Sequence, residues 1–216
     1  MEILQKTVPD LLAKQIRDEI IRGNYQPGER LRLRDLADRY NISTMPVREA
    51  LKTLEIEGLV VGEPRKGVRV TQLTTAELED IYDMRVTLEA MAARLAVPHI
   101  SAETIDELSE IIVQIDNAQG DPVKIVELNT KFHTLLYAAS ERKHLCSVIS
   151  TLRTRVAHYF RAYMSEIGTY AQEDHQAILV ACRNRDAERA AAIMHEHIAR
   201  AGRAVVASHK LLESEE

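Results

Sequence analysis

Three histidines and one asparagine have the side-chain chemistry and spacing of a metal site. Asn129 and His133 are four residues apart in the segment NTKFH, and His175 and His197 follow in later segments. At 100° per residue, a helix over residues 121–140 places both members of the NTKFH pair beside its apolar stripe. The two later histidines also lie on apolar helix faces. Imidazole binds Zn, Ni, Cu or Fe, and facing helices of a bundle can build such sites.

Each histidine taken alone has a simpler explanation, because buried histidines are usually hydrogen-bonded residues of the core. Three such faces in one bundle, one with a second donor four residues earlier, favour a metal site. Three histidines with an open coordination position could also activate water, so a metal-dependent hydrolase or lyase is an alternative. That alternative lacks a general base, since Asn129 cannot serve and Glu173 and Asp174 are only sequence neighbours of His175.

The predicted metal ligands belong to an Ala-rich and Leu-rich second part of the chain. Thr74 or Thr75 can cap its first helix, with Glu77 in the first turn. The apolar spacing beyond this point predicts an all-α bundle of six helices. Their expected cores are residues 75–97, 102–116, 121–140, 142–164, 170–184 and 186–209.

The first part of the chain has a different pattern, with most of its Gly and Pro in residues 24–72. Apolar spacing predicts a helix from Val8 to the break GNYQPGE, a short helix near residues 33–40, and a third that begins at Ser43 or Thr44. The extended segments LVVGE and GVRVTQL follow, joined by PRKG, whose glycine is free to take a positive φ. This order predicts a winged helix-turn-helix, so the fold is expected to be mainly α, with domains 1–72 and 73–216.

Charge is divided unevenly between these two domains. The net charge of the 216 residues is −5. Residues 1–72 carry 13 Lys and Arg against 11 Asp and Glu, which gives +2, whereas residues 73–216 carry 15 against 22, which gives −7. We therefore expect only the first domain to face the phosphates of a nucleic acid.

Composition and cysteine usage indicate a cytoplasmic protein without a membrane partner. The chain has no run of eighteen apolar residues, and its start, MEILQKTVPD, is charged where a signal peptide would be apolar. Its two cysteines, Cys146 and Cys182, form neither a CxxC pair nor a disulfide framework, which fits a reducing compartment.

The third predicted helix has the features of a DNA-recognition helix. If its apolar residues pack inward, the opposite face presents Thr44 and Arg48, and an arginine there can bond guanine O6 and N7. Arg34 begins the preceding helix, and Arg65 and Lys66 lie at the tip of the hairpin, placed to meet phosphates or the minor groove. Two alternatives remain open: these are solvated surface charges, or the winged helix binds only protein.

The stretch PGERLRLRDLADRYNISTMPVREALKTLEIEGLV resembles the DNA-binding domain of GntR-family transcriptional regulators over about fifty residues. The resemblance implies DNA contacts by Arg34, by Arg48 and by the wing around Lys66 and Gly67. Thr44 stands where the family commonly has an arginine, so the operator sequence is not expected to carry over unchanged.

The segments RVTLEAMAARLA, NTKFHTLLYAAS and EDHQAILVACRNRDAERAAAIMHEHI resemble the helical ligand-binding domain called FCD, which follows the reader domain in the FadR-type branch of that family. The resemblance implies a divalent metal ion, Zn or alternatively Ni, held by Asn129, His133, His175 and His197. An aspartate is more usual at the first position. Because its replacement here is neutral, the site should favour an anionic effector.

A small carboxylate could fill the open coordination positions, steered by an arginine. The candidates are Arg85, Arg153 and Arg155, although Arg85 could instead form an i,i+4 pair with Glu89. The sequence as a whole predicts a homodimeric transcriptional repressor that binds a pseudo-palindromic operator in double-stranded DNA. Its second domain would bind the small organic acid effector and form the dimer.

Overall fold

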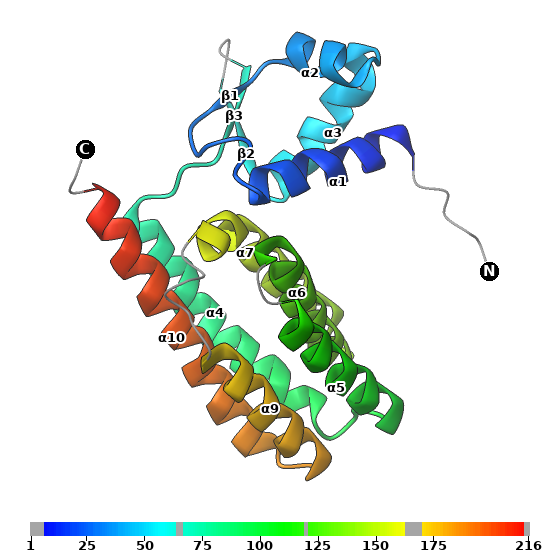
Figure 1. The fold of residues 1–216 in the computed structure, drawn as a ribbon, viewed down its shortest axis with the longest axis vertical. Helices are drawn as coiled ribbons and strands as arrows, with labels where there is room; N and C mark the ends of the chain where they lie inside the picture. The colour runs from blue at the N-terminus through cyan, green and yellow to red at the C-terminus, as the bar shows by residue number, and fades with distance from the viewer. Residues whose placement is uncertain (1–6, 64–66, 119–120, 163–169, 214–216) are drawn as a thin grey trace. The chain divides into compact units, whose positions relative to one another are not determined.

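The computed structural model describes residues 7–63, 67–118, 121–162 and 170–213. The chain divides into two compact units, Met1–Leu73 and Thr74–Glu216, which we call the N-terminal and C-terminal units (Figure 1). In the described ranges, no helix combines the length and the apolar character needed to cross a membrane.

The N-terminal unit is built on three helices, α1 (Val8–Ile21), α2 (Leu33–Tyr40) and α3 (Thr44–Ile56). The Thr7 side chain accepts a hydrogen bond from the Asp10 amide and so caps α1. Asn41 takes the left-handed conformation, with φ 51°, and ends α2 directly before the turn into α3. The helices bury Leu12, Ile16, Ile20, Leu36, Val47, Leu51 and Leu54 in a common core.

A small antiparallel sheet completes this unit, with strands β1 (Arg30–Leu31), β2 (Val60–Glu63) and β3 (Gly67–Val70) in the order β1-β3-β2. The predicted winged helix-turn-helix is confirmed, and Gly67 has the expected positive φ of 91°. The prediction of a two-stranded hairpin was incomplete, because β1 has only two residues and is too short for an alternating pattern. The wing-tip residues Arg65 and Lys66 lie outside the described residues.

The described part of the C-terminal unit contains six helices, as predicted. They are α4 (Thr75–Ala96), α5 (Ala102–Asn117), α6 (Pro122–Ala138), α7 (Lys143–Ala162), α9 (Tyr170–Arg183) and α10 (Ala187–Glu213). A capping box between Thr74 and Glu77 starts α4, which confirms the predicted N-terminal signal. The last helix continues past residue 209, where its predicted core ended.

The bundle is organised around α4, which packs along α10 and also contacts α6 and α7 (Figure 1). Gly202 of α10 lies so close to the Tyr82 ring of α4 that a Cβ there would be 2.8 Å from ring atoms. α9 packs against α10 and α5, and α5 packs against α6. Helices that are far apart in the sequence therefore share one interior.

Candidate metal centre and nucleic-acid interface

His133, His175 and His197 meet in the interior of the bundle, one each from α6, α9 and α10. They are 0%, 2% and 7% exposed, and one nitrogen of each lies within 4.8 Å of the others. The Nε2 atom of His133 is 3.4 Å from Nε2 of His175 and 3.3 Å from Nε2 of His197. Three of the four predicted ligands therefore converge.

In His175 and His197, the ring nitrogen that faces away from the cluster, Nδ1, lies beside a side-chain oxygen. His175 Nδ1 lies 3.2 Å from Gln172 Oε1, and Gln172 uses its amide nitrogen to donate to the Ile112 carbonyl and to Asp116. His197 Nδ1 lies 3.2 Å from a carboxylate oxygen of Asp174. Because both oxygens only accept, both histidines carry their proton on Nδ1. Their Nε2 lone pairs therefore point into the cluster.

The surroundings of His133 and His175 favour neutral imidazoles. Burial lowers the pKa of His133 well below its ordinary value, and the nearby Arg153 guanidinium and the other two histidines lower it further. Burial likewise lowers the pKa of His175 well below its usual range, assisted by His197 and Arg153. Neutral imidazoles with inward lone pairs are the form that binds a metal ion.

The two separations from His133 Nε2 fit a shared metal ion. With metal–nitrogen bonds of about 2.1 Å, two ligands are about 3.0 Å apart at a right angle and about 3.4 Å apart at a tetrahedral angle. The observed separations of 3.3 and 3.4 Å lie in this interval. Asn129, the fourth predicted ligand, is half-buried one turn before His133 on α6.

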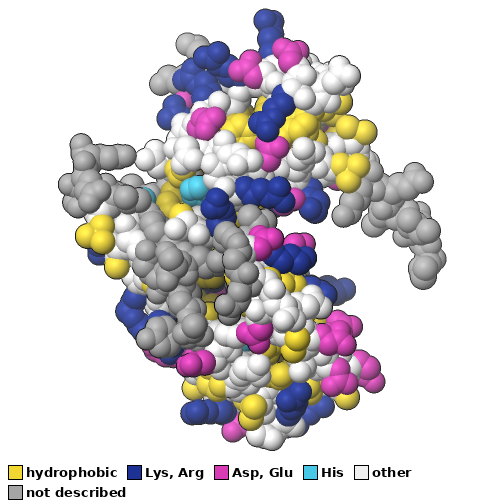
Figure 2. Space-filling model, in the orientation of Figure 1, with side chains coloured by type: hydrophobic (Ala, Val, Ile, Leu, Met, Phe, Trp, Pro, Cys, Tyr) yellow, Lys and Arg dark blue, Asp and Glu magenta, His cyan; other side chains and the backbone are white. Residues whose placement is uncertain are grey.

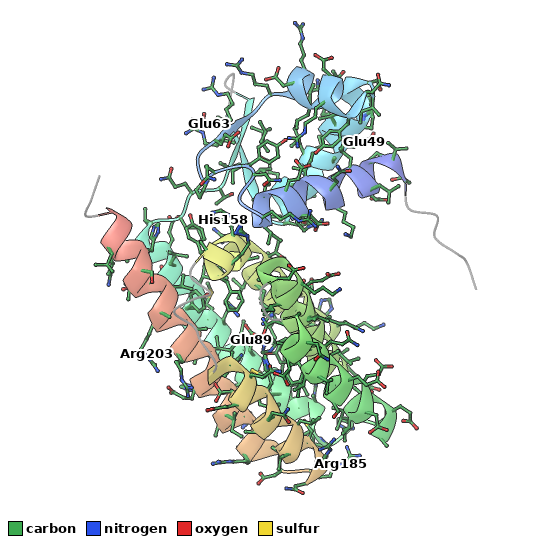
Figure 3. All side chains as sticks on the ribbon, viewed as in Figure 1. Glu49, Glu63, Glu89, His158, Arg185 and Arg203 are labelled. Carbon is green, nitrogen blue, oxygen red and sulfur yellow. The ribbon has the colours of Figure 1, made fainter. Side chains whose placement is uncertain are left out.

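The predicted effector-binding arginines occupy two different surroundings. Arg85 and Arg153 both bind Glu89, with Arg85 Nε 2.7 Å from Oε1 and Arg153 Nη1 2.9 Å from Oε2. The alternative pairing of Arg85 with Glu89 is therefore confirmed. Glu89 is fully buried and points into the bundle, whereas Arg203 projects outward from α10 (Figure 3). Arg155 is half-buried and lowers the pKa of Glu77, after the larger effect of the Thr74 hydrogen bonds.

Glu89 is ionised although it is buried. Burial alone would raise its pKa, but the Arg85 and Arg153 guanidiniums hold the pKa below its usual range. The Tyr137 hydroxyl also donates to Glu89, at 2.7 Å. Since the two arginines also lower the pKa of His133, this charged group borders the histidine cluster.

Two features of the site were missed or wrongly interpreted from the sequence. Asp174 is more than a sequence neighbour of His175, because it bonds His197 on the adjacent helix and also pairs with Arg200 at 3.6 Å. No sequence signal links it to a residue 23 positions away. Tyr137 was also missed, although its position four residues after His133 places both on one helix face.

Three of the six predicted DNA-contacting residues line one cleft of the N-terminal unit. Arg34 from α2, Arg48 from α3 and Gly67 from β3 line a cavity of about 650 Å³. Arg30, Arg32 and Lys52 also line it, against the acidic side chains Asp35 and Glu55. Thr44 is exposed at the first position of α3. Lys and Arg side chains are visible on the surface of this unit in Figure 2.

Comparison with known proteins matches each of the two units to a known protein family. Residues 10–70 match the family described as bacterial regulatory proteins, gntR family, and residues 80–200 match the FCD domain. The chain belongs to the GntR family, in the branch that carries an FCD domain. It is a DNA-binding transcriptional regulator and not an enzyme, so the hydrolase or lyase alternative is set aside.

Relatives of this GntR regulator match it over most of their length. The HTH-type transcriptional repressor GlaR of Escherichia coli is 31% identical over 195 residues, which cover 85% of this chain and 89% of GlaR. The HTH-type transcriptional regulator YdhC of Bacillus subtilis is 29% identical over 197 residues, 87% of each chain. The structure of E. coli McbR/YncC superposes with a TM-score of 0.80 at 25% identity, covering 90% of this chain and 95% of that one.

Proposed function

We propose that this GntR regulator is a homodimeric repressor that holds a divalent metal ion in its C-terminal unit and responds there to a small carboxylate. His133, His175 and His197 would bind the ion, with Asn129 as a fourth protein ligand. Zn fits the nitrogen-rich donor set best, and Ni is the second choice. The convergence of three buried Nε2 atoms carries this proposal.

Charge favours an anionic effector at this site. All four proposed ligands are neutral, so a bound divalent ion would keep its full positive charge. Arg85 and Arg153 share one carboxylate, Glu89, which leaves one further positive charge on or beside the part-buried Arg153. Because unpaired buried charge is costly, a carboxylate that reaches both the ion and Arg153 would be stabilised. The ion would supply an open coordination position for one carboxylate oxygen.

The N-terminal unit would read the operator through the cleft between α2, α3 and the wing. Arg48 would contact base edges, while Arg34 and the wing residues Arg65, Lys66 and Gly67 would meet the backbone. A homodimer formed by the C-terminal units would place two such clefts on a pseudo-palindromic operator. GlaR is named a repressor, which supports the same sign of regulation here. A regulator of chromosomal genes would act in the cytoplasm.

Metal analysis of the purified full chain tests the core of this proposal. We expect about one Zn²⁺ per chain, and we expect His175→Ala to lose most of it, because one of three nitrogen ligands is removed. His195→Ala is the matched control, since His195 is exposed two residues from His197 on the same helix. Equal metal content in His175→Ala and the wild type would exclude the three-histidine site.

A further inference from the structure

Tyr137 occupies a central position beside the histidine cluster. It is 2% exposed on α6, one turn after His133. Its hydroxyl oxygen lies 2.9 Å from His133 Nδ1, 2.7 Å from Glu89 Oε2 and 3.2 Å from Met194 Sδ. The hydroxyl therefore connects a proposed metal ligand to the carboxylate that holds Arg85 and Arg153.

The direction of each hydrogen bond follows from the charge on Glu89. Two guanidiniums bind this carboxylate at 2.7 and 2.9 Å, so it is ionised and can only accept. The single hydroxyl proton of Tyr137 therefore goes to Glu89, because a short charge-assisted bond is stronger than a bond to the Met194 thioether. The hydroxyl oxygen is then left to accept from His133, which must carry its proton on Nδ1.

This assignment completes the set of inward lone pairs. Gln172 and Asp174 already fix the protons of His175 and His197 on Nδ1. With Tyr137 accepting from His133, all three Nε2 atoms present lone pairs to one point. Without that acceptor, the His133 proton could move to Nε2, where two lone pairs at 3.3 and 3.4 Å would attract it. Such an internal hydrogen bond would compete directly with a metal ion.

We propose that Tyr137 is a positioning residue of the metal centre, which fixes the Nδ1–H tautomer of His133 and connects this ligand to the Glu89–arginine group. The inference rests on the proposed metal centre and adds a residue that touches neither the ion nor an effector. A carboxylate that draws Arg153 away from Glu89 would strengthen the hold of Glu89 on the Tyr137 proton. Ligand geometry and anion binding are thereby linked through one hydroxyl.

The tautomer of His133 in the metal-free wild type provides the first test. We expect long-range ¹H–¹⁵N spectra of the full chain to show a protonated Nδ1 and an unprotonated Nε2 for His133. In Tyr137→Phe, which keeps the ring and removes the hydroxyl, we expect the proton to appear on Nε2. A wild-type His133 protonated on Nε2 would overturn the proposal without any variant.

The second test measures Zn²⁺ affinity by competition with a chromogenic chelator. We expect Tyr137→Phe to bind Zn²⁺ about 10- to 100-fold more weakly than the wild type, the usual cost of losing an outer hydrogen-bond partner of a ligand. Tyr159→Phe is the control. Tyr159 is equally buried, and its ring packs on His209, twelve residues and therefore about 18 Å along α10 from His197.

The outcomes separate this inference from the metal centre itself. Tight binding by the wild type with unchanged affinity in Tyr137→Phe would overturn the role of Tyr137 and leave the three-histidine site standing. Equal losses in Tyr137→Phe and Tyr159→Phe would also overturn it, since the effect would then be general to buried tyrosines. No Zn²⁺ binding by the wild type would overturn the metal centre and this inference together.

Discussion

Asn129 is the one proposed ligand that is not a histidine, so its side chain can change the charge of the proposed centre. Replacing it by aspartate adds a charged oxygen ligand one turn before His133. We expect Asn129→Asp to raise Zn²⁺ affinity by roughly tenfold or more, about 1.4 kcal/mol, and to weaken binding of a carboxylate because one positive charge is cancelled. Chelator competition and a carboxylate titration of the zinc-loaded protein measure the two effects. Asn184→Asp adds the same charge at an exposed position, and equal behaviour of both variants would remove Asn129 from the ligand set.

The histidines could be found from the sequence because each lies on the apolar face of a periodic helix. The residues that surround them could not be found in this way. Asp174 reaches His197 across a helix–helix contact, and the neighbouring Glu89–Arg153 pair joins residues 64 positions apart. Such pairings depend on how α4, α7, α9 and α10 are arranged in space. Helical periodicity fixes only which face of each helix is buried.

The contact between α4 and α10 depends on a glycine in the middle of a helix. In an exposed helix, Gly→Ala would stabilise by about 1 kcal/mol. At Gly202, however, the new methyl would lie 2.8 Å from the ring and 3.0 Å from Cβ of the buried Tyr82, and overpacking costs about 1–3 kcal/mol. We therefore expect Gly202→Ala to lower the melting temperature in a thermal unfolding scan. A melting temperature at or above that of the wild type would show that α10 can move away from Tyr82 at little cost.

Helices were easier to predict than strands in this chain. The capping box at Thr74 and Glu77 marks the start of α4, and glycine or proline breaks mark several of the other ends. β1 has no such signal, since its two residues join the sheet only through pairing with Arg69 and Val68 of β3. Because β1 exists only through its pairing with β3, it can be identified only once the folded hairpin is known.

Across the whole molecule, a mildly basic DNA-binding unit is separate from an acidic helical unit. This division predicts how the proposed metal ion should influence DNA binding. The cleft lined by Arg34 and Arg48 lies in one unit and the three histidines lie in the other. Removing the metal with a chelator should therefore leave basal operator affinity largely intact but abolish the shift produced by the most effective acid in a carboxylate screen. His175→Ala should behave in the same way without chelator, and His195→Ala should respond like the wild type.

Thermodynamic linkage makes the same prediction quantitative. If the acid weakens operator binding by some factor, operator DNA must weaken binding of the acid by the same factor. Fluorescence anisotropy with labelled operator gives the first factor, and calorimetric titration of the acid into free and DNA-bound protein gives the second. Because operator binding depends on phosphate contacts, both titrations need the same salt concentration. Unequal factors under matched conditions, or a full response in metal-free protein, would contradict a metal-bound carboxylate as the signal.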